Sequence, residues 1–317
     1  FSPDERAMWF KDRISAVFST IGGVIPVSSL LKVPVAAGIL DVVSSPNMDV
    51  YLGRGVGGGS LVNLAMLITP YRETLQRILP AGIDINELYN VYYPRARATL
   101  GANKIRPGYF QNSAYHRYAR VACTQAARAG FQWRTLDSGY DMAYMEQEEA
   151  GLVPKSALGA EGGFGNNHGK KSLDKTYLPR ACQAGARLFT RVSVLSVEHV
   201  PSDVRHPWRV HCVRTSERAQ WGALQRNGAA EIEHYGFSIR TARVILSAGT
   251  FGSSEILLRS QRQGLDVASA WLGQGISANG DDLCAAYALP DVADGIGRSS
   301  VAGAANSSGP TISAVIR

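Results

Sequence analysis

The sequence is poor in cysteine and in charge. Its four cysteines, among 317 residues, lie far apart and form no CxxC pair, so we expect neither a metal site nor a disulfide framework. Charged residues make up 19%, and the net charge of +7 is spread without a lysine or arginine cluster, so we expect no nucleic-acid partner. No run approaches the roughly 18 uncharged apolar residues of a membrane span, so we expect no transmembrane segment.

Glycine is what the sequence has in excess, with 33 residues. They show no G-X-Y period, which excludes collagen, and 45% hydrophobic residues exclude a disordered chain. The length fits one large or two ordinary domains. The chain starts at Phe1 without a signal segment and ends in a strand-like stretch, 311–317. We therefore expect a fragment of a longer protein, and the compartment stays open between cytoplasmic and secreted.

Periodicity changes along the chain from helical to strand-like. We expect a short strand at 48–52 and then helices at 71–79, at 86–100 with a bend at Pro94, at 112–129 and at 172–184. Strands are expected at 187–200, 208–213, 231–240 and 242–248, followed by a glycine turn at 249–252 and a helix at 253–263. A buried strand, a glycine turn and a helix N-terminus form a nucleotide-binding element of α/β proteins.

Another glycine motif, earlier in the chain, follows the expected strand at 48–52. Gly53, Gly55 and Gly58 match the dinucleotide fingerprint GxGxxG, and Glu73 follows about twenty residues later. The fingerprint requires a strand that ends at the acidic residue, whereas the residues around Glu73 read as a helix. Two interpretations stay open: a loop whose backbone approaches a flat or phosphorylated ligand, and a tight turn against a neighbouring element.

Three long motifs occur in a fixed order. They are NMDVYLGRGVGGGSLVN at 47–63, the segment 151–177 with VPKSAL, GNNHGK and SLDKTY, and LSAGTFGSSEILL at 246–258. Together they resemble the bacterial cholesterol oxidases, flavoenzymes of the glucose-methanol-choline (GMC) oxidoreductase family.

The resemblance implies an α/β (α+β) protein with an incomplete FAD-binding fold of the glutathione-reductase type and inserted helical, substrate-domain segments. It implies FAD as cofactor. It also implies contacts to FAD from the loop that follows the first strand, from the backbone of a later strand and from the turn before the last helix. The residues carried over are Gly53, Arg54, Gly57, Gly58, Gly59, Ser60, Asn63, Met66, Val192 and Gly249.

The sequence also departs from the family. The family's own GxGxxG and its catalytic His and Asn match nothing here, and we expect that pair beyond Arg317, so no residue of this chain is assigned as catalytic. Leu64 and Ala65 stand where two glycines are expected and would crowd the flavin or redirect the substrate. Val315 stands at the position of a proton-shuttling Glu in a tentative alignment, so we expect no isomerase activity.

We expect the parent protein to oxidise the CH–OH group of an apolar alcohol, for example a sterol, with oxygen or another electron acceptor. The alternative is a truncated or decayed chain that binds FAD weakly or not at all. Three segments are expected: 1–168 with substrate-side helices and the glycine loop, 169–285 as part of the FAD-binding domain, and 286–317 as the start of a substrate-domain sheet.

Other candidates favour structural roles. His168 could serve as a base near neutral pH, but the resemblance places its segment beside the cofactor and away from the family's catalytic histidine. The acidic cluster of Glu146, Glu148 and Glu149 is expected to be a solvated face. The cysteines are expected to be small buried hydrophobic residues.

Overall fold

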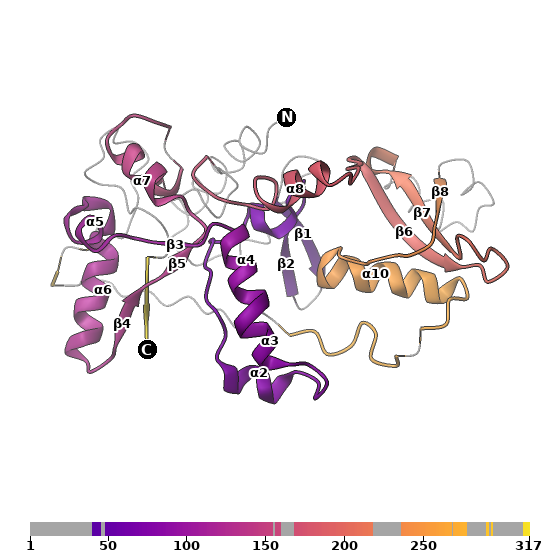
Figure 1. The fold of residues 1–317 in the computed structure, drawn as a ribbon, viewed down its shortest axis with the longest axis horizontal. Helices are drawn as coiled ribbons and strands as arrows, with labels where there is room; N and C mark the ends of the chain where they lie inside the picture. Colours follow the sequence, from indigo (N-terminus) through magenta and orange to yellow (C-terminus); the bar gives the residue numbers. More distant parts are fainter. Residues whose placement is uncertain are drawn as a thin grey trace. The chain divides into compact units, whose positions relative to one another are not determined.

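The computed structural model describes residues 40–45, 48–154, 156–159, 168–217, 236–267, 269–277, 290–291, 293 and 313–317. The chain divides into two compact units (Figure 1). Unit 1 comprises Phe1–Ala186 and Ala286–Arg317, and unit 2 comprises Arg187–Ala285. The three-segment division that the sequence suggests stays a prediction.

The described strands of unit 1 form three antiparallel pairs. β1 (Leu40–Ser45) pairs with β2 (Met48–Gly53), β3 (Asn103–Lys104) with β5 (Asp137–Ser138), and β4 (Trp133–Thr135) with β9 (Ala314–Ile316). The expected strand at 48–52 is confirmed, and so is the strand within 311–317. β9 joins residues near the end of the chain to those near its middle, and it lies beside the helix α6 (Figure 1).

The helices of unit 1 are short. They are α2 (Arg72–Ile78), α3 (Ile85–Glu87), α4 (Tyr93–Thr99), α5 (Pro107–Asn112), α6 (Arg117–Arg128), α7 (Met142–Glu149) and α8 (Tyr177–Gln183). Single turns are found at η2 (Gly58–Leu61), η3 (Leu88–Tyr92), η4 (Ala114–His116) and η5 (Ala157–Gly159).

Two of the expected helices are interrupted. Residues 86–100 are helical, but a π-helical turn at η3 comes directly before α4, where Pro94 occupies the first turn. Pro94 has no N–H to donate into the preceding turn, so the break occurs there. The expected helix 112–129 starts as η4, with the Ser113 side chain accepting from the Tyr115 amide, and continues as α6. Gly130, with φ +84°, ends it as expected.

The core of unit 1 lies between α5, α6, α7 and the loops that follow α7. It contains Phe110, Tyr115, Cys123, Met145 and Leu158, each 2% exposed or less. Cys123, and Cys212 in unit 2, are buried as expected of small hydrophobic residues, whereas Cys182 is exposed. Cys284 lies outside the described residues.

In the described residues of unit 2, one helix packs on a three-stranded antiparallel sheet. The sheet has the order β6 (Val192–His199), β7 (Trp208–Arg214) and β8 (Gly236–Thr241). This confirms strands within 187–200 and 208–213 and a strand in the described part of 231–240, of which 231–235 lie outside the described residues. The helix α10 (Gly249–Arg262) packs on β6 (Figure 1). Ser260 accepts the Val197 amide at 2.8 Å, and Arg259 donates to the Leu195 carbonyl at 3.1 Å.

The expected buried strand at 242–248 is wrong in this structure. These residues are irregular, and Ile245 is 89% exposed. No described strand lies alongside them, and a strand without a neighbour leaves its backbone hydrogen-bonding groups unpaired. The helix that follows begins at Gly249, four residues before the expected start.

The described part of the chain therefore mixes helices with sheets, and all of its strand pairs are antiparallel. None of the described helices is both long enough and apolar enough to cross a lipid bilayer.

Candidate cofactor site

The glycine loop begins where β2 ends and folds back on that strand. A Cβ atom on Gly53 would lie 2.7 Å from both the Gly58 carbonyl oxygen and the Gly59 Cα, so no side chain fits there. Gly57 has φ +114° and Gly58 has φ +55°, values that L-residues with side chains rarely adopt. Since Glu73 lies in α2, as the sequence indicated, no strand brings it to this loop, and the dinucleotide fingerprint does not apply.

The outer side of the same loop is open. A Cβ atom on Gly58 or on Gly59 would meet no atom within 4 Å. Close packing against the chain therefore explains the glycine at Gly53 but not the one at Gly59, which is exposed and has φ outside the left-handed region. A flat ligand that approaches the backbone would account for Gly59, so the loop fits the flavin of FAD on this side.

The Ser60 side chain links the glycine loop to the segment that follows Ser172. Its Oγ donates to the Gly57 carbonyl at 2.7 Å and accepts the Leu173 amide at 2.9 Å. The next residue, Leu61, is fully buried. The first motif, at 47–63, is thus held by the second, at 151–177.

Lys170 provides a second connection between these motifs. Its ammonium group donates to the Asn63 carbonyl, although the residue is only 2% exposed. Burial lowers the pKa of Lys170 to about 7, against the opposing effect of Asp174. A positive charge on this carbonyl polarises the peptide between Asn63 and Leu64 and strengthens the Leu64 N–H as a donor.

The residues from Asn63 to Met66 differ in whether their side chains are exposed or buried. Asn63 is exposed, and its Oδ1 accepts the Ala65 amide at 3.1 Å. Ala65 has φ +54°, a conformation that favours glycine, and its methyl group belongs to the buried core. Of the two residues expected to crowd the flavin, Ala65 therefore points into the protein, and Leu64 is half-buried. Met66 is 41% exposed.

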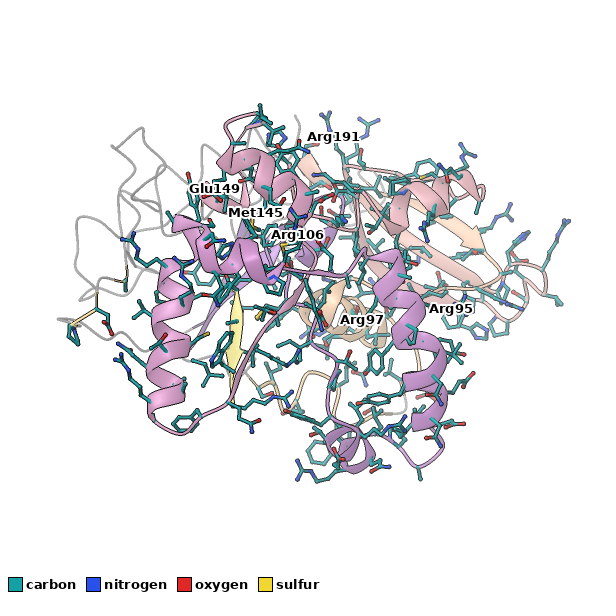
Figure 2. All side chains as sticks on the ribbon, turned by 60° about the vertical axis from the view of Figure 1, so that its left-hand side comes forward. Arg95, Arg97, Arg106, Met145, Glu149 and Arg191 are labelled. Atoms are coloured by element: carbon teal, nitrogen blue, oxygen red, sulfur yellow. The ribbon has the colours of Figure 1, made fainter. Side chains whose placement is uncertain are left out.

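The acidic cluster on α7 is not the solvated face that the sequence indicated. Glu148 is 2% exposed and accepts the amides of Ser156, Ala157 and Leu158 at 2.9 to 3.3 Å. Burial still raises the pKa of Glu148, because desolvation outweighs these hydrogen bonds. Glu149 lies one turn after the buried Met145 on the same helix (Figure 2), and its Oε2 is buried too.

The position of Glu148 matters for the site because of what its segment contacts. Ser156 accepts the Gly169 amide at 3.3 Å, next to Lys170. A Cβ atom on Gly169 would lie 2.7 Å from the Tyr144 ring. Glu148 thus holds the segment against which the Lys170 backbone packs. Neither residue is among the site residues expected from the sequence, although Lys170 lies within the second motif.

Two expected cofactor residues, Val192 and Gly249, lie in unit 2. Val192 is half-buried at the start of β6, where it faces Arg214. Gly249, with φ +74°, opens α10, and a Cβ atom there would meet nothing within 4 Å. The N-terminus of a helix is suited to phosphate groups, so Gly249 fits the phosphate region of FAD. The other expected cofactor residues all lie in unit 1, where Arg54 is half-buried.

The remaining candidates are His168, Val315 and clusters that could hold a metal ion. His168 is exposed, and its carbonyl accepts from the Lys175 ammonium at 3.4 Å. Val315 lies in β9 opposite Arg134 and is half-buried. Among the residues that the structure describes, no three His, Cys, Asp or Glu side chains gather in a way that could hold a metal ion.

The chain matches the model of a known family. The family model described as GMC oxidoreductase covers residues 32–277, which is more than half of the chain. It represents the N-terminal domain of that family, which is the domain that binds FAD. The match includes the glycine loop, Glu148, Lys170, Val192 and Gly249.

Proposed function

Since the chain belongs to the GMC oxidoreductase family and is an FAD-dependent oxidoreductase, we propose that it oxidises the CH–OH group of an apolar alcohol, for example a sterol. The observation that carries the proposal is the glycine loop. It is closed towards the protein at Gly53, open at Gly59, and supported from behind by the buried Lys170.

In this proposal each part of the chain has its own task. Gly57, Gly58 and Gly59 bring backbone to the flavin, with Ser60 fixing the loop and Asn63 beside the ring. We also assign Gly53, Arg54 and Met66 to the contact with FAD. Val192 offers backbone to the adenine, and Gly249 lies along the phosphates.

When bound, FAD supplies the hydride acceptor, and oxygen or another acceptor takes the electrons afterwards. The chain contributes position and charge. Lys170 fixes the Asn63 carbonyl, and through it the direction and strength of the next N–H donor. No described residue is proposed as the catalytic base; His168 is exposed, and the structure shows only its backbone carbonyl accepting from the Lys175 ammonium.

The substrate side follows from two side chains. Leu64, which stands where a glycine is expected, narrows the space between the glycine loop and the substrate. This favours alcohols whose hydroxyl-bearing carbon lies at a narrow end of the molecule. Val315 has no proton to exchange, so we propose that a steroid double bond is not shifted after oxidation.

A second possibility is a chain that binds FAD weakly or not at all. The exposed, irregular stretch 242–248 favours it, since Ile245 is 89% exposed where the sequence indicates a buried strand next to the cofactor. An incompletely packed element at this position would weaken the hold on the phosphates at Gly249.

Purification of the 317-residue chain in the presence of FAD separates the two. We expect a visible flavin spectrum that survives gel filtration. Bleaching of that spectrum by an apolar alcohol without oxygen is expected of the parent protein, which would supply the catalytic His and Asn expected beyond Arg317. Cholesterol, a long-chain primary alcohol and glucose form the test panel, with glucose as the polar control. Flavin retention by the parent protein without bleaching by any alcohol contradicts the proposed substrate class, whereas loss of flavin from the 317-residue chain supports the second possibility.

A further inference from the structure

Unit 2 contains a pocket that FAD binding does not use in the proposed function. It has a volume of about 850 Å³ and lies between the sheet β6–β7–β8 and the end of α10 with the loop that follows it. Its apolar lining includes Leu195, Trp208, Phe237 and Leu265. Small-molecule sites are typically concave, of this size, and lined by apolar and aromatic side chains with a few polar groups.

The polar groups of this pocket form a connected row across the three strands. Glu198 on β6 lies with its Oε2 3.0 Å from Nε2 of His211 on β7. Ser238 on β8 lies with its Oγ 2.9 Å from Nδ1 of the same ring. His211 and Ser238 are directly opposite each other in the β7–β8 register, which fixes their separation. The row is therefore built by strand pairing rather than by flexible loops.

The chemistry of the three side chains fixes the direction of each hydrogen bond when the imidazole is neutral. An ionised Glu198 can only accept, so Nε2 of His211 carries the hydrogen and donates it. Nδ1 is then an acceptor, and the Ser238 hydroxyl must donate to it. A serine whose proton is directed at an imidazole, itself oriented by a carboxylate, is the arrangement of an activated nucleophile.

We propose that Ser238, His211 and Glu198 form a nucleophilic site that hydrolyses carboxylic esters with an apolar acyl or alcohol part. The Ser238 Oγ forms a bond to the acyl carbon while its proton passes to Nδ1 of His211. The ester C–O bond breaks as His211 returns that proton to the leaving alcohol. Water then attacks the acyl carbon, gives a proton to His211, and releases the carboxylic acid as Ser238 regains its proton.

Access and charge stabilisation are consistent with this reaction. The side chains of His211 and Glu198 are 34% and 44% exposed, and Ser238 is exposed, so a substrate can reach the row from solvent. Among the described strands, β8 pairs with β7 alone. Alternate backbone N–H groups along such an edge strand are not used by the sheet and can donate to a developing oxyanion beside Ser238.

Two probes test the site on the full 317-residue chain. A fluorophosphonate should label Ser238, as located by peptide mass spectrometry, and p-nitrophenyl butyrate should be hydrolysed. We expect Ser238→Ala to abolish the labelling, and Ser238→Ala and His211→Gln each to lower hydrolysis at least about 100-fold. Glu198→Gln should lower it strongly too, because the glutamine amide can donate to Nε2 and leave the ring hydrogen on Nδ1, which then cannot accept the Ser238 proton.

The matched control is Ser202→Ala, which removes an exposed serine from the turn between β6 and β7. It should keep both labelling and hydrolysis. Labelling that maps elsewhere, or hydrolysis that is equal in wild type and Ser238→Ala, overturns the proposal and leaves the row as a cross-strand hydrogen-bonded cluster. Because neither probe requires FAD, failure here is independent of the proposed oxidoreductase function.

Discussion

The buried ammonium of Lys170 makes a specific prediction about stability and pH. In the folded protein the pKa of Lys170 is about 7, while the ordinary value is 10.5. Between these values the unfolded chain binds a proton that the folded chain does not. The free energy of unfolding therefore rises with pH across this window.

The size of the effect follows from the two pKa values. Each unit of pKa difference corresponds to about 1.4 kcal/mol, so the difference between about 7 and 10.5 corresponds to about 5 kcal/mol of stability over the whole window. Lys170→Met removes the titrating group and keeps most of its apolar volume. The variant loses the hydrogen bond to Asn63, worth about 1 kcal/mol, but no longer buries a charge. We therefore expect it to be more stable than wild type at pH 7, with the difference shrinking towards pH 10.

Urea unfolding followed by circular dichroism, at intervals from pH 6 to 10 and without FAD, measures both quantities. Lys171→Met is the matched control, because Lys171 is the sequence neighbour and its ammonium is only one-third exposed, 3.6 Å from Asp141. The control should keep the wild-type slope. A slope that is the same in wild type and Lys170→Met would refute the assignment of the titration to this buried side chain.

Three further predictions concern single residues. Gly53→Ala places a Cβ 2.7 Å from backbone atoms and should lower the free energy of unfolding by about 1–3 kcal/mol. The Cβ of Gly59→Ala meets no protein atom, so this variant should keep its stability and lower the affinity for FAD. Thermal melts and flavin titration measure the two effects, and equal losses of stability in both variants would argue against a ligand at Gly59. Burial lowers the pKa of His116 from 6.5 to about 4, so acidification from pH 6.5 to 4 should lower the free energy of unfolding by about 3 kcal/mol, measured by urea unfolding. His116→Gln should flatten this dependence of stability on pH, and an unchanged dependence would show that another group is responsible. Arg191 has φ +60° and is exposed, so Arg191→Gly should raise the free energy of unfolding by about 1 kcal/mol, measured by urea unfolding. A lower free energy of unfolding in this variant would contradict the backbone-strain argument.

Much of the secondary structure could be predicted from local pattern alone. The alternation in β6 and β7, the helix that ends at Gly130 and the break at Pro94 depend on short-range sterics and on which face is buried. These determinants are present in the sequence itself, and the structure confirms them.

The stretch 242–248 shows where that reasoning stops. Its apolar core, Val244 to Leu246, favours a buried strand by composition, but strand formation depends on a neighbour that supplies hydrogen bonds. The described residues contain none beside it, and Ile245 is 89% exposed. Composition predicts that a segment can form a strand, whereas the presence of a pairing partner decides whether the strand forms.

The candidate site shows a related limit. The glycine loop was found through its residues, and its five glycines look alike in the sequence. Only the folded backbone separates Gly53, where the chain itself excludes a side chain, from Gly59, where it does not. The supporting charges are harder still to find, because Glu148 and Lys170 belong to residue types that are rarely buried. Their burial becomes intelligible once the three amides held by Glu148 and the Asn63 carbonyl held by Lys170 are seen. Glu148 accepts amides at the start of the turn η5, and Lys170 donates to a carbonyl of the glycine loop, so each buried charge satisfies backbone groups of a turn or loop.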